Sequence, residues 1–290
     1  MSTMEGLRAA ELDTPSVGRK RRRGWMFGAA LAVLAVTVVG VIASPFLQEA
    51  ATRQDILSSL LPAGSPGHPL GTDGLGRDVL LMTLAGTASS VVGPVCIALG
   101  SMVLGVLWGS IAGYLRGPAD FIIGRTTDLL LSLPVMLVAL VVAGLLGSGY
   151  WVTVFMLMVL FSPSDIRLVR AGYLEQSALP YVEAGRMLSL PAPVIMYRHI
   201  LPNILPVALT NLMLNTAIAL VTLSSLSFLG IGVAPGTPDW GRQITDSRQF
   251  LMDNPAGMVV PAVLIILVAW AVTVVGDRWG ERLAGREEAS

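Results

Sequence analysis

Four polar side chains lie within one of the most apolar stretches of this chain, at Asn211, Asn215, Thr222 and Ser225. At about 100° per residue they fall within roughly 80° of arc, so a helix over residues 205–229 carries one polar stripe. Amide and hydroxyl groups can hydrogen-bond a passing polar solute. They can equally bond a neighbouring helix, because polar side chains inside a membrane face protein or water rather than lipid. The stripe therefore predicts either a translocation path or interhelical hydrogen bonding.

Other kinds of chemistry have little support in the sequence. The glycine-rich stretch GTDGLGRD, residues 71–78, lacks the Gly-Lys-Ser/Thr ending of a phosphate-binding loop and follows no predicted strand. No Ser-His-Asp or paired-carboxylate pattern stands out, and the single Cys96, within an apolar run, predicts packing. We expect no catalytic residue, metal site or bound cofactor in this chain.

The composition indicates the elements that position the stripe. The chain has 290 residues, 53% of them hydrophobic and only 13% charged, and its mean hydropathy is +0.71. About a quarter of the residues of a typical soluble domain are charged, so these values indicate a membrane protein. The net charge is zero, so the bulk charge gives no sign of a nucleic-acid partner, and we expect none.

Six apolar runs predict six transmembrane helices in an all-α polytopic membrane protein. A helix needs roughly 20 residues to cross the hydrocarbon core. The run 150–163 is short, and we expect its helix to continue through SDIRLVRAGYLEQ. The predicted spans are 25–47, 91–114, 129–146, 150–163, 205–229 and 258–275.

The Lys and Arg residues predict the orientation of these spans. With both termini in the cytoplasm, 15 of the 19 basic residues lie inside, leaving Arg53, Arg77, Arg242 and Arg248 outside. A cleaved signal peptide is the competing interpretation of the first run, but its apolar part is long for one, which favours a retained anchor. The first 18 or so residues are polar and aperiodic, and we expect them to be disordered.

The predicted organisation follows from these spans. It comprises a basic cytoplasmic tail (1–24), a first transmembrane helix (25–47), an external segment (48–86), a five-helix core (87–276) and a cytoplasmic tail (277–290). The core includes a cytoplasmic segment at 164–202 and an external loop at 230–256.

A short polar helix interrupts the apolar runs within LPYVEAGRMLSLPAPVIMYRHILPN, residues 179–203. Pro180 suits a first helical turn, and Pro191 cannot continue a helix, so a helix of some ten residues is expected over 180–189. Tyr181, Ala184, Gly185 and Leu188 share one face of it, and its small residues allow close approach by another surface.

This stretch resembles the cytoplasmic EAA loop of ATP-binding-cassette importer permeases. Glu183 and Ala184 match the pattern, as do Leu201 and Pro202 at the expected distance. Three positions depart from it: Gly185 replaces an Ala, His199 replaces a frequent Ile, and Ser189 replaces a Gly that can adopt a positive φ. HPLGTDGLGRDVL (68–80) and LSFLGIGVAPGTPDWGRQI (226–244) are similar to segments of the C-type permease of the dipeptide, oligopeptide and nickel group.

The resemblance implies a function and a set of partners. It implies a type I importer permease in a bacterial plasma membrane, paired with a second homologous permease, two cytoplasmic ATPase domains that bind ATP and Mg, and an external substrate-binding protein. Short peptides are the implied substrate, with nickel, haem, glutathione or another small solute as alternatives. The resemblance implies a coupling helix that meets the ATPase, and the implied coupling residues are Tyr181, Glu183, Ala184, Gly185, Leu188, Ser189 and Pro202.

Two other classes of protein stay open. A homo-oligomeric channel would need no ATPase, and the EAA-like helix is the feature against it. A secondary carrier is expected to place ionisable residues in its spans, and the central spans here have almost none.

The remaining features are interpreted as packing. Gly105, Gly109 and Gly113 repeat every four residues and allow close approach of another helix. Pro134 and Pro261 can kink their spans, and Arg125 is expected to pair with Asp128.

The external loop contains Asp239, Trp240 and Gly241. These residues predict either structural anchoring or a gate or binding-protein contact.

Overall fold

The computed structural model describes residues 17–147 and 149–287, and its regular structure over these residues is helical. The predicted disordered tail lies almost wholly outside the described part of the chain. The long helices are α2 (Val17–Thr52), α4 (Thr87–Leu115), α5 (Gly117–Ser132), α6 (Val135–Leu146), α7 (Tyr150–Gln176), α10 (Leu201–Phe228) and α12 (Ala256–Glu287). The short ones are η1 (Ile56–Ser58), α3 (Val79–Ala85), α8 (Pro180–Met187), α9 (Ala192–Val194), the π-helical turn η2 (Ile195–Ile200), α11 (Trp240–Ser247) and η3 (Arg248–Phe250).

Five of the described helical segments are long and apolar enough to cross a membrane, and a sixth span exists if α5 and α6 are counted as one bent pair. This agrees with the predicted all-α polytopic fold. The helices extend beyond several predicted limits. The first continues to Thr52, and α12 continues through the predicted C-terminal tail as far as Glu287.

The predicted third span, 129–146, is wrong as a single continuous helix. The chain breaks between Ser132 and Val135, and the axes of α5 and α6 differ by 88°. Leu133 is extended (φ −87°, ψ 131°), as expected for a residue that precedes proline, and Pro134 has no N–H to continue the ladder. Pro261 has no comparable effect and lies inside α12.

The predicted extension of the fourth span is confirmed. A single helix of 27 residues, α7, continues past Pro163 to Gln176, which at about 1.5 Å per residue gives a length of roughly 40 Å.

The centre of the molecule is the crossing of α4 and α7. The crossing is close because the positions on α4 that face α7 are glycines. A Cβ at Gly105 would lie 2.5 Å from the Cβ of Asp165, and one at Gly113 would lie 2.5 Å from the Cβ of Tyr173. Between them, a Cβ at Gly109 would lie 2.8 Å from a backbone oxygen of α7. The glycine stripe therefore lets the two backbones approach.

The ion pairs of α5 differ from the predicted one. Asp128 does not pair with Arg125 on its own helix; it accepts a hydrogen bond from Arg167 of α7 at 2.8 Å, and Arg125 lies over the ring of Phe121. A second pair on the same side joins Arg170 of α7 to Asp120. Both acidic side chains of α5 thus bind the adjacent helix, because α7 continues far enough to bring its arginines opposite them.

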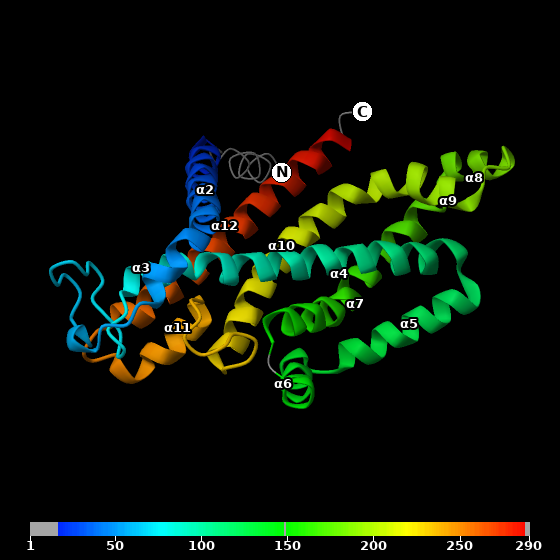
Figure 1. Cartoon of the computed structure of the whole chain (residues 1–290). Helices are drawn as coiled ribbons and strands as arrows, with labels where there is room; N and C mark the ends of the chain where they lie inside the picture. The colour runs from blue at the N-terminus through cyan, green and yellow to red at the C-terminus, as the bar shows by residue number, and fades with distance from the viewer. Residues whose placement is uncertain (1–16, 148, 288–290) are drawn as a thin grey trace, which may run out of the picture.

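Two irregular regions lie at opposite ends of the molecule (Figure 1). We call them the α8 end, formed by α8, α9 and η2, and the α11 end, formed by α11 and the segment 53–78. Helices α7 and α10 lead into and out of the α8 end, so whatever happens there acts directly on two long helices of the core.

Candidate coupling site and buried polar cluster

The start of α8 is set by Pro180, and its end is set by the hydrogen bonds that close its last turn. Leu179 is extended and Pro180 occupies the first turn, where a missing N–H costs nothing. After Met187 the chain closes with hydrogen bonds from Leu188 N to Ala184 O (3.0 Å) and from Leu190 N to Gly185 O (3.2 Å). This confirms a short helix over the predicted range.

Ser189 adopts a left-handed conformation, with φ of 54°. It is the position where the EAA pattern has glycine, and the backbone keeps the glycine-like geometry although the residue is serine. The left-handed conformation costs an L-residue about 1–2 kcal/mol, so the turn carries local strain.

One side of α8 rests on a hydrophobic cluster. Val182 is fully buried against Tyr173 of α7 and against Ile195 and Ile200 of η2. The Tyr173 hydroxyl donates to Met196 O at 3.0 Å, and Arg186 lies over the ring of Tyr114 at the end of α4. The helix is therefore held against the ends of α4 and α7 and against η2, which leads into α10.

The other side of α8 is uncovered. Met187 and Leu188 are 77% and 75% exposed, and Glu183, Ala184 and Ser189 are exposed as well. A hollow of about 530 Å³ lies beside them, lined by Ser177, Ala178, Leu179, Glu183, Arg186 and Met187. Together they form an apolar surface with a charged rim, of a kind that suits a protein partner.

Two predicted residues of this site have positions that the sequence did not indicate. Gly185 faces the core side, where its Cβ would lie 3.7 Å from the side chain of Ile195, so it is not part of the exposed face. Tyr181 bridges the two long helices: its hydroxyl donates to Gln176 Oε1 at 2.7 Å and accepts from Asn203 Nδ2 at 3.0 Å. Pro202 is exposed in the first turn of α10.

The polar stripe of α10 divides into two parts. The side chains of Asn211 and Asn215 both donate to Oδ1 of Asp165 on α7, at 2.6 and 2.8 Å. Thr222 is buried, and Ser225 is partly exposed and donates to a carbonyl of its own helix, Val221 O. The two asparagines are thus occupied by interhelical hydrogen bonds in this structure.

Asp165 is a residue that the sequence reasoning missed. The apolar run of the sequence ends at Pro163, so the predicted organisation places Asp165 in the cytoplasmic segment 164–202, outside the membrane core. It is fully buried. The signals that could have found it are the glycine stripe of α4 and the asparagine pair of α10, both of which need a partner on a neighbouring helix.

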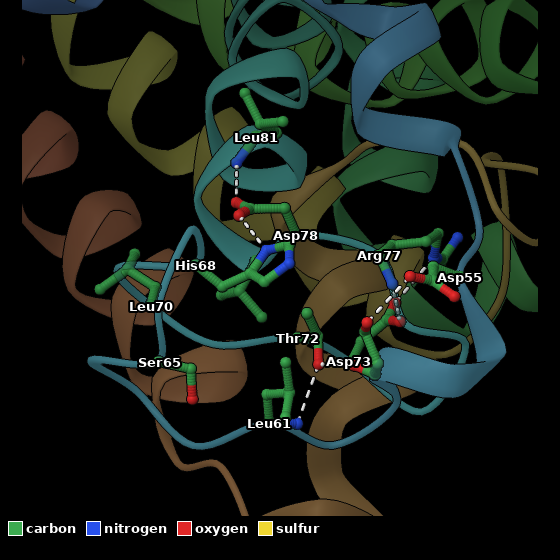
Figure 2. Close-up of polar contacts among 12 residues, drawn as sticks. Asp55, Leu61, Ser65, His68, Leu70, Thr72, Asp73, Arg77, Asp78 and Leu81 are labelled. Carbon is green, nitrogen blue, oxygen red and sulfur yellow. Dashed lines mark hydrogen bonds and ion pairs between the residues drawn. The ribbon is translucent and has the colours of Figure 1, made fainter.

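At the α11 end, the segment 53–78 is folded by its own polar contacts (Figure 2). Asp78 caps α3 by accepting from Leu81 N at 2.9 Å, and its other oxygen pairs with His68 Nδ1 at 2.8 Å. Arg77 pairs with Asp73 at 2.7 Å. A Cβ at Gly76, where φ is +71°, would overlap the carbonyl of Asp55. The glycines of GTDGLGRD therefore serve tight turns rather than phosphate binding.

This segment is tied to distant parts of the chain. The side-chain amide of Asn254, which precedes α12, donates to Leu70 O at 2.9 Å, to Thr72 O at 3.2 Å and to Leu61 O at 3.4 Å. Arg77 also donates to Gly236 O at 3.3 Å. A single amide thus holds several turns of the segment in place.

Trp240 has a structural role. It is 2% exposed, and its indole Nε1 donates to Thr83 O at 2.9 Å. Asp239 caps α11 by accepting from Arg242 N at 3.0 Å and also accepts from Ser90 of α4 at 3.2 Å. Burial raises the pKa of the Asp239 carboxyl above its ordinary value. Of the two predicted roles for this loop, the buried position of the Trp240 side chain supports anchoring.

The apolar helices, the close glycine crossing and the exposed short helix between two spans define a multi-pass helical membrane protein. The family model described as "Binding-protein-dependent transport system inner membrane component" matches residues 105–288. The chain belongs to this family and is a multi-pass inner-membrane protein.

Curated relatives cover most of the chain. The glutathione transport system permease protein GsiD of Pectobacterium atrosepticum is 34% identical over 73% of this chain and 71% of its own length. The dipeptide transport system permease protein DppC of Haemophilus influenzae is 30% identical over 89% of both chains. These similarities identify the chain as a transport permease related to peptide and glutathione permeases.

A solved structure has the same fold. A chain from the inward-facing MetNI methionine ABC transporter matches with a TM-score of 0.52 at 20% identity, covering 70% of this chain and 96% of its own. The architecture is therefore that of an ABC importer permease.

Proposed function

We propose that this chain is one permease subunit of an ATP-driven, binding-protein-dependent importer, and that α8 is its coupling helix. The observation that carries the proposal is the uncovered face of α8. Its exposed Met187 and Leu188 lie beside a hollow, on a helix held by the ends of α4, α7 and α10. A partner that docks on this face and moves would displace the core helices.

The remaining subunits follow from this role. The α8 end and both termini face the cytoplasm, where two ATPase domains bind ATP and Mg. A second homologous permease completes the pore within the lipid, and an external binding protein delivers substrate at the α11 end. This chain performs no covalent chemistry and binds no nucleic acid or metal.

Short peptides are the proposed substrates. Relatives named as dipeptide and glutathione permeases support a small peptide or peptide-like solute, and nickel and haem are alternatives within the same class of importer. The polar stripe of α10 borders the proposed path. Asn211 and Ser225, its partly exposed members, are the positions where cysteines should react with water-soluble thiol reagents in at least one nucleotide state.

Purification of the tagged chain from its native membrane in mild detergent, with mass spectrometry of the proteins recovered, tests the proposal. An ATPase and a second permease should be present. Ala184→Arg should release the ATPase and abolish uptake without preventing membrane insertion, because Ala184 is on the exposed face of α8. Gly185→Arg is a poorer probe, since that position packs against Ile195.

Leu57→Arg is the matched control. Leu57 is 99% exposed at the opposite end of the molecule, so the same added charge there should leave the ATPase bound. Recovery of the chain alone as a homo-oligomer would instead indicate a channel or carrier, and normal ATPase retention by Ala184→Arg would remove α8 from the coupling role.

A further inference from the structure

A fully buried carboxylate joins the two helices that flank α8. Oδ1 of Asp165, on α7, accepts hydrogen bonds from Asn211 and Asn215, which are one turn apart on α10. Oδ2 has no hydrogen-bond partner among the described residues. We call Asp165, Asn211 and Asn215 the α7–α10 clasp.

The clasp lies between the proposed coupling helix and the middle of the spans. Asp165 is eleven residues before the end of α7, roughly 16 Å along the helix axis, and Asn211 is ten residues into α10. The two helices that enter and leave the α8 end are therefore joined to each other well inside the core.

A third helix closes the clasp. Gly105 of α4 lies so close that its Cβ would be 2.5 Å from the Cβ of Asp165. The Ser101 hydroxyl, one turn earlier on α4, also lies beside the carboxyl. The Cβ and backbone of Asp165 are thus packed directly against α4, while its Oδ1 atom accepts from α10.

Stability alone gives no reason for this arrangement. The nearby arginines of α7 are used elsewhere, since Arg167 pairs with Asp128 and Arg170 with Asp120. Among the described residues, none forms an ion pair with Asp165. A buried carboxyl group with one oxygen unpaired is costly, and well-packed apolar side chains often stabilise as well or better. The best-attested benefit of such a group is fixed register, because hydrogen bonds are directional and apolar contacts can slide.

We propose that Asp165 is a positioning residue for transport: with Asn211 and Asn215 it fixes the register of α7 against α10, so that displacement of α8 moves both helices as one body. This inference rests on the proposed coupling role of α8. In this role the buried Asp165 acts through the two helices and not on substrate or nucleotide. Loss of the clasp should uncouple ATP hydrolysis from transport, so that more ATP is hydrolysed per molecule imported, rather than abolish either activity on its own.

The first measurement uses the full chain and requires no partner. In a Cys96→Ala background, spin labels at Glu175 on α7 and Val207 on α10, both exposed, report the separation of the two helices by double electron–electron resonance. The parent should give one narrow distance distribution. Asp165→Leu should broaden or split it, and Asp165→Asn should leave it narrow, because a carboxamide oxygen can still accept from both asparagines.

The second measurement uses the purified complex in proteoliposomes, with a radiolabelled dipeptide and radiolabelled glutathione as probes. The number of ATP molecules hydrolysed per probe molecule imported should rise at least tenfold in Asp165→Leu and stay at the parent value in Asp165→Asn. Thr216→Val is the matched control, since Thr216 is adjacent to Asn215 but bonds only within its own helix, to Leu212 O.

A fully apolar variant separates register from stability. Asp165→Leu combined with Asn211→Leu and Asn215→Leu leaves no buried polar group unpaired at the clasp, so its unfolding midpoint should match or exceed that of the parent. Its spin-label distances should nevertheless be broad and its coupling lost. If this variant or Asp165→Leu kept narrow distances or the parent ratio of ATP to transport, the proposal would be overturned.

Failure of the proposed function has a different signature. A parent complex that shows no ATP-dependent uptake would contradict the importer assignment for these probes, while the spin-label distances would still decide whether Asp165 fixes the register of α7 and α10.

Discussion

Replacing Gly105 with Ala tests the close crossing of α4 and α7. A Cβ at this position would lie 2.5 Å from the Cβ and 2.9 Å from the carbonyl carbon of Asp165. Both belong to a packed helix, so relief to ordinary contact at 3.4 Å requires the helices to separate. Overpacking of this kind costs about 1–3 kcal/mol, offset by the roughly 1 kcal/mol that Ala gains over Gly in a helix. We expect a net loss of up to about 2 kcal/mol.

Gly124→Ala is the matched control. Gly124 is also in the interior of a helix, α5, and a Cβ there would meet nothing within 4 Å. The same substitution should therefore be neutral or stabilise by up to about 1 kcal/mol.

The assay is titration of the purified chain from mild detergent into sodium dodecyl sulfate, followed by tryptophan fluorescence, which the six tryptophans supply. Both variants are compared with the parent at equal mole fractions of the denaturing detergent. If Gly105→Ala were as stable as Gly124→Ala, the close approach of α4 and α7 would be refuted, and with it the seating of Asp165 between the helices.

Three further predictions concern other parts of the molecule. Ser189→Gly should stabilise the turn after α8 by about 1 kcal/mol, because glycine adopts the positive φ freely; hydrogen exchange of the adjacent amides would slow, and unchanged exchange would contradict the strain. Asn254→Ala should expose the segment 53–78 to limited proteolysis at least tenfold faster, since its side-chain amide donates to three carbonyls of that segment; parent-like cleavage would show that the segment is held otherwise. Because burial raises the Asp239 pKa, its contribution to stability is complete below the ordinary value of 3.8 and is lost as pH rises above it. Asp239→Asn should remove this part of the pH dependence of the unfolding midpoint, and identical pH profiles for parent and variant would refute the assignment.

The sequence could predict features that depend on local patterns. Pro180 begins α8 because proline acts on its own turn, although the helix ends at Met187, before Pro191 is reached. The spacing of Gly105, Gly109 and Gly113 indicates a close crossing whatever the partner. The continuation of α7 past Pro163 followed from the length that a membrane crossing requires.

Features that depend on distant parts of the chain were not predictable. Proline kinks a helix by an amount that depends on its surroundings, so Pro134 gave no sign that α6 turns by 88° while Pro261 stays inside α12. Asp165 looked like a surface residue because its partners are 46 and 50 residues away on another helix. Asp128 lies three positions after Arg125 on its own helix, yet it binds Arg167, which is near only because α7 is long enough to reach it.

The attachment made by Asn254 has a consequence for the making of the protein. Its side chain binds carbonyls of residues that are up to 193 positions earlier in the chain. At a synthesis rate of about 5–20 residues per second, the ribosome needs roughly 10–40 s to cover that distance. Until Asn254 has been synthesised, the segment 53–78 is held only by the hydrogen bonds of its own turns, and the three carbonyls that Asn254 will bind are hydrated instead. The α11 end is therefore completed only after about seven-eighths of the polypeptide has been made, and a chain truncated before Asn254 would lack the contacts that hold the segment 53–78.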